Sequence, residues 1–436
     1  MLIHRKQASR TFAFCMAVAI ALGAFGFAAS PGVFAADVPV EIVPISAGFS
    51  DTGSHWGRDA VARWTELDVL RGYEDGSFRP NNPITRGEVA VILDRIMKYE
   101  TAASNAFTDL RSGEFYTDAI LRANAAGVMQ GDGATVRPTA SITREEATAL
   151  LARAFGVTDA SASSSFSDNS QIASWARGLV AQMASEGYVQ GSGGAFRPKD
   201  SITRAEIATI LDNAIGALYT SAGTYTENVS NIAIVNTTGV TLRGISVSGN
   251  VILAEGIGNG DVTLDNVSVG GKLVVRGGGS NSVAISGGSI QQVSVSKTVA
   301  GDIRITGLDN SNAKIVIDDV DGTVILDNVK AGVTLDGEVT QIDVRGGSQL
   351  NSLTLNASTH LAVDAASRIT SLVVNSSARG ATVNNLGTIT KAEVSANGVV
   401  FEGKAPAALT VSSGVTTPPV DSSGKAIAPT SSTGGG

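Results

Sequence analysis

Ile84-Thr85-Arg86-Gly87-Glu88 is a five-residue stretch that the chain repeats, as Ile142-Thr143-Arg144-Glu145-Glu146 and as Ile202-Thr203-Arg204-Ala205-Glu206. Thr followed three residues later by Glu is the pattern of a capping box, in which each side chain accepts a hydrogen bond from a backbone N–H of the first turn. Each copy therefore predicts the start of a helix. The predicted caps are Thr85 with Glu88, Thr143 with Glu146, and Thr203 with Glu206.

Capping does not explain the arginine after each threonine. A cation in the first turn opposes the helix macrodipole by roughly a few tenths of a kcal/mol. The unpaired N–H groups of a helix N-terminus, however, form a natural anion site, and a guanidinium beside them would grip a carboxylate or phosphate. The sequence therefore favours Arg86, Arg144 and Arg204 as ligand-binding residues. The alternative is that duplication copied them and that they pair with neighbouring acids.

The repeated unit is much longer than five residues. Each copy opens with an aromatic-polar-acidic triplet, and the triplets recur at nearly equal intervals: Phe49-Ser50-Asp51, Phe107-Thr108-Asp109 and Phe166-Ser167-Asp168. An aromatic residue follows in each, at Trp56, Phe115 and Trp175. Because the triplets and the threonine motifs share one period, they indicate an internal repeat.

Each copy then reads as helix, loop, helix. Glycine ends the first helix, at Gly72, Gly131 and Gly191, and the loop closes on Arg-Pro, where proline keeps the preceding backbone extended. A module of about 55 residues is marginal for a core of its own, so we expect the three to pack together with clefts between adjacent copies. Copy two has Phe115 in place of Trp and a shortened loop, and we expect its cleft to bind least well.

These motifs, in this order and in three copies, make residues 49 to 219 similar to the S-layer homology (SLH) domain in its usual triplet. The resemblance implies a pseudo-threefold prism of helices that docks secreted proteins to secondary cell-wall polysaccharide. Its typical ligand is a pyruvylated N-acetylmannosamine unit, whose ketal supplies a carboxylate. The repeats span 49–101, 102–160 and 161–219.

The resemblance also implies roles for individual residues. Arg86, Arg144 and Arg204 would hold the pyruvyl carboxylate. The other implied ligand contacts are Asp51, Asp109 and Asp168 with sugar hydroxyl or amide groups, Trp56 and Trp175 against the sugar, and backbone N–H groups near Gly72, Gly131 and Gly191. The alternatives are that the aspartates are turn or N-cap acceptors and that the tryptophans pack in the core.

The N-terminus predicts export. Basic residues precede an apolar run from Phe12 to Ala29 and a small-residue site at Val33-Phe34-Ala35, which is typical of a signal peptide at 1–35, with a linker at 36–48. An uncleaved membrane anchor is the alternative. Cleavage would leave 29 basic and 40 acidic residues, a net charge of −11, and would remove Cys15, the only cysteine. This composition excludes disulfide and thiol chemistry and argues against nucleic-acid binding.

The second half changes character after Gly223. The stretch from Val240 to Leu253 aligns with a second stretch from Val262 to Val275, and short apolar triads continue between Gly, Asn and Asp. A period of about 22 residues or slightly fewer predicts a right-handed parallel β-helix-like solenoid over 220–411. A sandwich of hairpins is the alternative. The fold class is therefore multi-domain α plus β, with a flexible Ser/Thr/Pro/Gly tail at 412–436.

Catalytic patterns are weak. Asp318, Asp319 and Asp321 form the one tight acidic cluster, a weak metal candidate that reads more simply as a solvated Asp-Gly turn. No Ser/His/Asp or Cys/His arrangement is present, and no cofactor is expected. We therefore predict a non-enzymatic protein of the cell wall or S-layer, held on wall polysaccharide, whose solenoid is free to self-assemble or to meet a surface partner. The alternatives are an SLH-anchored enzyme with a lyase-like β-helix, and a tether between an outer membrane and peptidoglycan.

Overall fold

The computed structural model describes residues 48–158 and 164–430. The predicted signal peptide and nearly all of the linker lie outside these residues, as do the junction of repeats two and three and the last six residues. No helix in the described part is long and apolar enough to cross a membrane.

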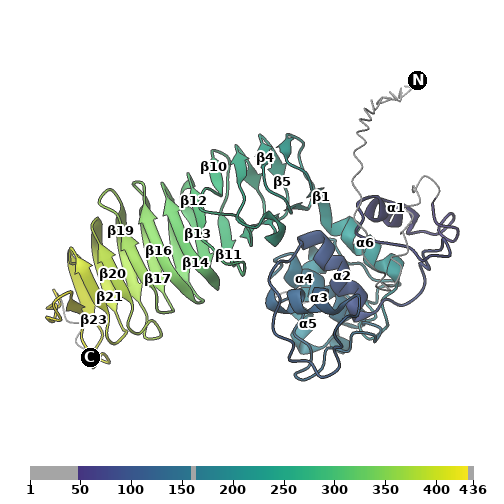
Figure 1. The fold of residues 1–436 in the computed structure, drawn as a ribbon, viewed down its shortest axis with the longest axis horizontal. Helices are drawn as coiled ribbons and strands as arrows, with labels where there is room; N and C mark the ends of the chain where they lie inside the picture. Colours follow the sequence, from purple (N-terminus) through teal and green to yellow (C-terminus); the bar gives the residue numbers. More distant parts are fainter. Residues whose placement is uncertain (1–47, 159–163, 431–436) are drawn as a thin grey trace, which may run out of the picture. The chain divides into compact units, whose positions relative to one another are not determined.

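The first half is helical, with two α-helices per copy (Figure 1). The helices are α1 (Arg58–Glu66), α2 (Arg86–Met97), α3 (Thr117–Ala125), α4 (Arg144–Ala154), the 3-10 turn η1 (Asn169–Gln171), α5 (Ser174–Ser185) and α6 (Arg204–Ala214). The three predicted capping boxes are confirmed: α2, α4 and α6 each begin directly after the predicted threonine, with both reciprocal hydrogen bonds present.

Three equivalent isoleucines join the copies in a ring. The backbone N–H of Ile84 donates to Ile202 O, that of Ile142 to Ile84 O, and that of Ile202 to Ile142 O, each at 3.0 Å. All three side chains are buried. Because each copy donates to one neighbour and accepts from the other, the three modules close on themselves, as the marginal core of one module requires.

The second half is a parallel β-solenoid, and the hairpin sandwich is excluded because every pairing between two named strands in the described residues is parallel (Figure 1). The first eleven-stranded sheet contains β1 (Ile215–Tyr219), β3 (Ile232–Val235), β6 (Val251–Leu253), β9 (Leu273–Val275), β11 (Gln292–Val295), β13 (Asp309–Ile317), β15 (Lys330–Leu335), β17 (Gln349–Leu355), β19 (Arg368–Val374), β21 (Thr388–Val394) and β23 (Ala408–Val411).

The second eleven-stranded sheet contains β2 (Gly223–Tyr225), β4 (Val240–Arg243), β7 (Val262–Asp265), β10 (Ala284–Ser286), β12 (Ile303–Thr306), β14 (Val320–Asp327), β16 (Val339–Arg345), β18 (His360–Val363), β20 (Thr382–Asn385), β22 (Val400–Gly403) and β24 (Val420–Asp421). A two-stranded sheet pairs β5 (Ser246–Val247) with β8 (Ser268–Val269). The predicted alignment of the two stretches is the register of β4 on β7, in which Val240 lies opposite Val262.

Alternate side chains of the solenoid strands point inward and form its core. On the first sheet the outward positions also form a column, with one residue per strand. The column is apolar on the early strands, at Leu218, Ile234, Ile252 and Val274, and is mixed from Ser294 onward. The early residues share a buried cluster with the helices, so the helical repeats cover this end of the sheet.

Polar contacts complete this interface. Asn236 Nδ2 donates to Ile96 O at 2.8 Å, and Asn250 Nδ2 donates to Phe155 O at 2.9 Å. The buried guanidinium of Arg276 donates to the carbonyls of Ala154 and Arg153, at 2.6 and 2.8 Å. The bonds from Asn250 and Arg276 supply donors to carbonyls at the C-terminal end of α4, and the bond from Asn236 does so at the end of α2.

The solenoid extends beyond both predicted boundaries. β1 begins at Ile215, immediately after α6, so residues 215–219 belong to the first sheet and not to the third repeat. At the other end, Thr430 exchanges hydrogen bonds with the backbone of Leu409 in β23, and the N–H groups of Thr416 and Thr417 donate to Asn397. Residues 412–430 thus form the last turn of the solenoid and cover part of an exposed strand edge.

Candidate functional site

The three motif arginines are buried and reach across the ring into the next copy. Arg144 Nε donates to Phe196 O at 2.8 Å and its Nη1 to Glu206 Oε1 at 2.9 Å. Arg204 makes the same contacts with Phe78 O and Glu88, at 2.9 and 3.0 Å. The equivalent contacts of Arg86 are with Val136 O at 2.8 Å and Glu146 at 3.2 Å. Each arginine therefore ties two copies together.

The prediction that these arginines lie beside unpaired N–H groups is wrong. The first two N–H groups of each second helix donate to carbonyls of the neighbouring copy, as in Arg86 N to Ala140 O and Gly87 N to Pro138 O, at 3.0 and 2.8 Å. The third N–H is bonded to the capping threonine. The backbone N–H groups that an isolated helix would offer to an anion are therefore already hydrogen-bonded to the neighbouring copy or to the cap.

The three motif aspartates hold their own loops. Asp51 accepts hydrogen bonds from the backbone N–H groups of Phe78 and Arg79, at 2.8 and 2.7 Å, and Asp109 and Asp168 do the same in their copies. Both carboxylate oxygens are thus used inside the loop, which is the turn-acceptor role given above as the alternative.

This pairing also overturns one backbone prediction. The arginine before each loop proline is not extended but left-handed, with φ of 56° at Arg79, 51° at Arg137 and 60° at Arg197. Such φ values are unfavourable for a residue with a Cβ. The two N–H bonds to each aspartate hold the backbone there.

Acid should weaken this loop. Burial alone would raise the pKa of Asp51, but the N–H groups of Phe78 and Arg79 outweigh it and leave the pKa below its usual value. A lowered pKa contributes stability above the unfolded pKa of about 4, and this stability is lost as pH falls through the folded pKa.

We therefore expect Asp51→Asn to reduce the free energy of unfolding at pH 7 by about 1 kcal/mol, a modest value because Asp51 is exposed and water screens its charge. The difference from the wild type should shrink as pH falls below 4, measured by thermal unfolding across pH. Asp59→Asn, at an exposed aspartate of α1, is the control. A difference that stays constant down to pH 3 would contradict this linkage.

The loop glycines are required by close packing. A Cβ on Gly72 would lie 2.1 Å from Cε1 of the Phe49 ring, and one on Gly191 would lie 2.5 Å from Ala195 O. The equivalent contact of Gly131 is Thr135 O at 2.5 Å, and Gly131 also has a positive φ of 69°. Glycine lets the opening phenylalanine of each copy pack against its loop.

Two clefts lie beside these loops, and each contains residues of all three copies. The copy-two cleft, of about 450 Å³, is formed by Gly131, Arg137 and Arg153 of copy two, Arg86 of copy one and Trp175 of copy three. The copy-one cleft, of about 150 Å³, is formed by Gly72, Tyr73 and Arg95 of copy one, Arg204 of copy three and Phe115 of copy two. As expected, these clefts lie between adjacent copies, and the third copy also contributes a residue to each.

Because the aromatic residue of one copy lies at the cleft of another, the substitution of Phe115 for Trp in copy two affects a different cleft. Phe115 borders the copy-one cleft, whereas the larger copy-two cleft faces a tryptophan. Phe115, Trp56 and Trp175 are 71%, 64% and 49% exposed, so they do not pack in the core. The expectation that the cleft of copy two binds least well rests on Phe115 and on the shortened loop; Phe115 borders the copy-one cleft, and the ranking of the clefts stays a prediction.

Sequence reasoning missed two cleft residues, Arg95 and Arg153. Each lies at the same distance after its motif arginine, on the second helix of its copy, and each is partly buried against a cleft. The common offset could have revealed them. In copy three the same position is Asn213.

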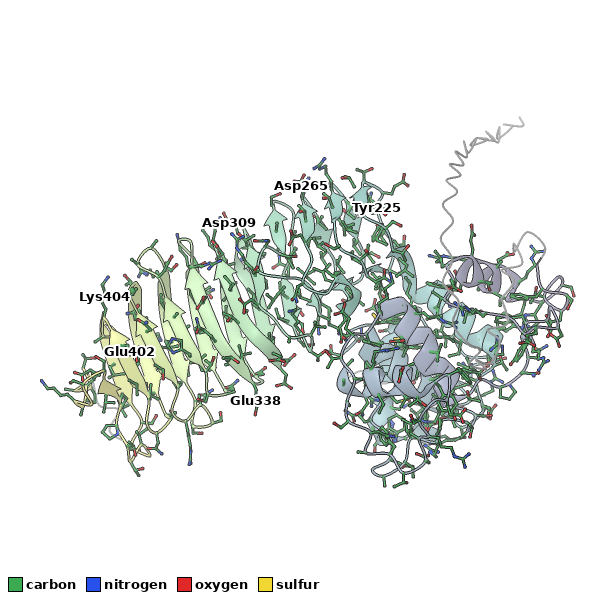
Figure 2. All side chains as sticks on the ribbon, viewed as in Figure 1. Tyr225, Asp265, Asp309, Glu338, Glu402 and Lys404 are labelled. Carbon is green, nitrogen blue, oxygen red and sulfur yellow. The ribbon has the colours of Figure 1, made fainter. Side chains whose placement is uncertain are left out.

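The acidic cluster of the solenoid does not form a metal site. Across 48–158 and 164–430, no group of three or more His, Cys, Asp or Glu side chains could hold a metal ion. Asp319 Oδ1 accepts a hydrogen bond from Glu338 N at 2.8 Å, and Figure 2 shows Glu338 at the edge of the strand stack opposite Asp309. Burial raises the pKa of Asp318, and the neighbouring Asp336 and Asp319 raise it further.

Comparison with known proteins agrees with the repeat. The model of the "S-layer homology domain" matches residues 48–90, 106–148 and 165–208. The chain is 35% identical over 170 residues to an amylopullulanase of Thermoanaerobacterium thermosulfurigenes, which covers 37% of this chain and 9% of that protein. It is 30% identical over 198 residues to the surface-layer 125 kDa protein of Lysinibacillus sphaericus, with 43% and 17% covered.

The chain is also 27% identical over 186 residues to the S-layer protein sap of Bacillus anthracis, with 41% of this chain and 23% of that protein covered. The chain thus spans less than a quarter of the length of these three relatives. The match to the amylopullulanase lies in the helical repeats. The motifs, the closed ring of helices and the domain match lead to one conclusion: the chain carries three S-layer homology domains, followed by a parallel β-solenoid.

Proposed function

We propose that the protein is secreted and held non-covalently on secondary cell-wall polysaccharide by its SLH triplet, with the solenoid as a structural element of the cell surface. Three SLH domains and relatives among surface-layer proteins support a cell-surface protein anchored through these domains. The solenoid would present a surface and not catalyse a reaction. Release of unsaturated oligosaccharides from wall glycan by the full chain would instead favour the lyase-like alternative.

The observation that carries the proposal is the copy-two cleft. Its volume of about 450 Å³ falls within the range of pockets that hold small ligands. It combines the guanidinium groups of Arg86, Arg137 and Arg153 with the exposed ring of Trp175. Cations suit a carboxylate and an aromatic face suits a sugar ring, which is the chemistry of a pyruvylated sugar.

Anchoring would be multivalent. The ring of copies repeats the same motif residues three times on one rigid unit, and a wall polysaccharide repeats its sugars along one chain. Once one cleft has bound, the next contact is intramolecular and has a high effective concentration. Weak individual sites would therefore be sufficient for stable attachment.

The test is co-sedimentation of the full mature chain with purified wall sacculi, before and after mild acid removal of pyruvyl ketals. We expect sedimentation before treatment and its loss afterwards. Trp175→Ala should weaken binding about tenfold, because an aromatic contact at the centre of a site is worth on the order of 1.4 kcal/mol. Leu386→Ala, at a large exposed side chain of the solenoid outside the helical repeats, is the control and should leave binding unchanged. Equal sedimentation with treated and untreated walls would refute recognition of a ketal.

A further inference from the structure

We propose that Arg95 and Arg153 are the direct anion-binding residues of the two clefts, and that the buried motif arginines mainly hold the ring together. This inference rests on the proposed function and names the side chains that would contact the carboxylate. It follows from comparing how far the charge of each cleft arginine is already neutralised.

Two motif arginines, Arg144 and Arg204, have little binding capacity left, and Arg86 has its Nε bonded to Val136 O at 2.8 Å and its Nη1 paired with Glu146 at 3.2 Å. Arg144 uses all three guanidinium nitrogens, since its Nη2 also donates to Gln190 O at 3.0 Å. Arg204 does likewise, with Nη2 bonded to Arg71 O at 2.7 Å. Each is paired with a glutamate at about hydrogen-bond distance. A ligand carboxylate would have to compete with these internal acceptors.

Arg95 and Arg153, in contrast, each donate one side-chain hydrogen bond, to a backbone carbonyl. Arg95 Nη1 donates to Val69 O at 3.0 Å and Arg153 Nη1 to Val128 O at 3.5 Å. Within the described residues, neither forms an ion pair with a carboxylate, and neither donates another side-chain hydrogen bond. Both therefore retain unused donors in a fork geometry that suits a carboxylate.

The acids near Arg95 are already engaged. Asp94 accepts two bonds from Arg122, at 2.9 and 2.7 Å, and Asp68 accepts two from Arg71, at 2.7 and 2.8 Å. Burial lowers the pKa of Arg95 and of Arg153, so their charged forms are incompletely solvated. A partly buried cation without an acidic partner is stabilised by an anion that enters from the cleft.

The rest of each cleft leaves a positive excess. The copy-two cleft has three arginines against Asp132 and Glu146, and the copy-one cleft has three arginines against Glu88. The whole sequence carries a net charge of −8. Positive charge is thus concentrated locally in an acidic protein, which favours an anionic group at these two places and not over the general surface.

The chain itself provides a variant of this position. Asn213 occupies the equivalent place in copy three, where its Nδ2 reaches Tyr188 O at 3.5 Å. The fold therefore accepts asparagine in place of arginine here. Arg95→Asn and Arg153→Asn should fold normally, which separates a loss of binding from a loss of structure.

The experiment is co-sedimentation of the full chain with wall sacculi over a range of salt concentrations. We expect R153N to weaken binding about tenfold, R95N to weaken it less because its cleft is smaller, and the double variant to weaken it most. The salt dependence of binding should fall in the same order. R153K, which keeps the charge but not the fork, should fall between R153N and the wild type.

Asn213→Ala is the matched control and should leave the affinity within about twofold of the wild type. Thermal unfolding should place every variant within a few degrees of the wild type. If R153N and R95N sediment as well as the wild type, the inference fails while the proposed function stands. If N213A weakens binding as much as R153N, the position acts through structure and the inference also fails. If the wild type itself does not sediment with untreated sacculi, the proposed function fails and the inference fails with it.

Discussion

Arg144→Ala is expected to lower the free energy of unfolding of the helical repeats by about 3–5 kcal/mol, which is the usual effect of removing one partner of a buried ion pair. The substitution leaves the carbonyls of Phe196 and Gln190 and the carboxylate of Glu206 without their buried donor. For a unit of this size the melting temperature should fall by roughly 10 °C. Thermal unfolding followed by circular dichroism measures it.

Arg197→Ala is the control for this experiment. Arg197 donates to the same Glu206 oxygen at 3.0 Å, but its side chain is 43% exposed. An exposed ion pair contributes at most about 1 kcal/mol, so the melting temperature should change by only a few degrees. If Arg144→Ala unfolds at the wild-type temperature, the motif arginine does not tie the copies together. The comparison matters for any binding assay, because alanine variants of motif arginines would lose ligand binding and stability together.

Ile252→Asp should separate the solenoid from the helical repeats. Ile252 is fully buried and belongs to the outward column of the first sheet, within the cluster that it shares with the helices. A carboxylate there would be buried among the apolar side chains of this cluster, so the loss combines several kcal/mol of desolvation with the lost apolar burial. We expect a melting temperature lower by at least about 10 °C and faster limited proteolysis around residue 215.

Thr354→Asp tests the same column farther along the solenoid. Thr354 lies between Thr334 and Val373 in register and is only partly buried. A surface substitution of this kind should change stability by less than about 0.5 kcal/mol. Similar melting temperatures for the two variants would mean that the helices do not stabilise the early strands.

Local sequence rules predicted the elements of this fold well. Thr and Glu at fixed spacing placed three helix starts correctly, and the alignment of Val240 with Val262 gave the register of β4 on β7. Both signals act between residues that are close in sequence or in equivalent positions of a repeat. Such information can be read without knowing which distant segments meet.

The site was harder to predict because it depends on which copies are neighbours. Arg86 and Glu88 lie two residues apart in the same motif. The glutamate that Arg86 contacts, however, is Glu146 of the next copy. The same exchange places Trp175 beside Arg86. No spacing within one copy specifies these contacts, since they follow from the direction in which the ring closes.

The outer boundaries of the solenoid were missed for a different reason. Ser, Thr and Pro after Ser412 are typical of flexible chain, but Thr416 and Thr430 use their hydroxyl and N–H groups to satisfy an open strand end. Composition measures how little apolar surface a segment can bury. Composition does not show that a polar segment can still donate and accept hydrogen bonds at the open strand edge of the solenoid.

Because Ile84, Ile142 and Ile202 form a cycle of backbone hydrogen bonds, the smallest unit that can fold in this way is the set of three copies and not one sequence repeat. A deletion that removed one copy in frame would preserve every local helix signal but leave a donor on one survivor and an acceptor on the other facing water. Moving this unit into another protein therefore requires all three copies together, because a pair of copies would keep its loop residues but lose the closed ring.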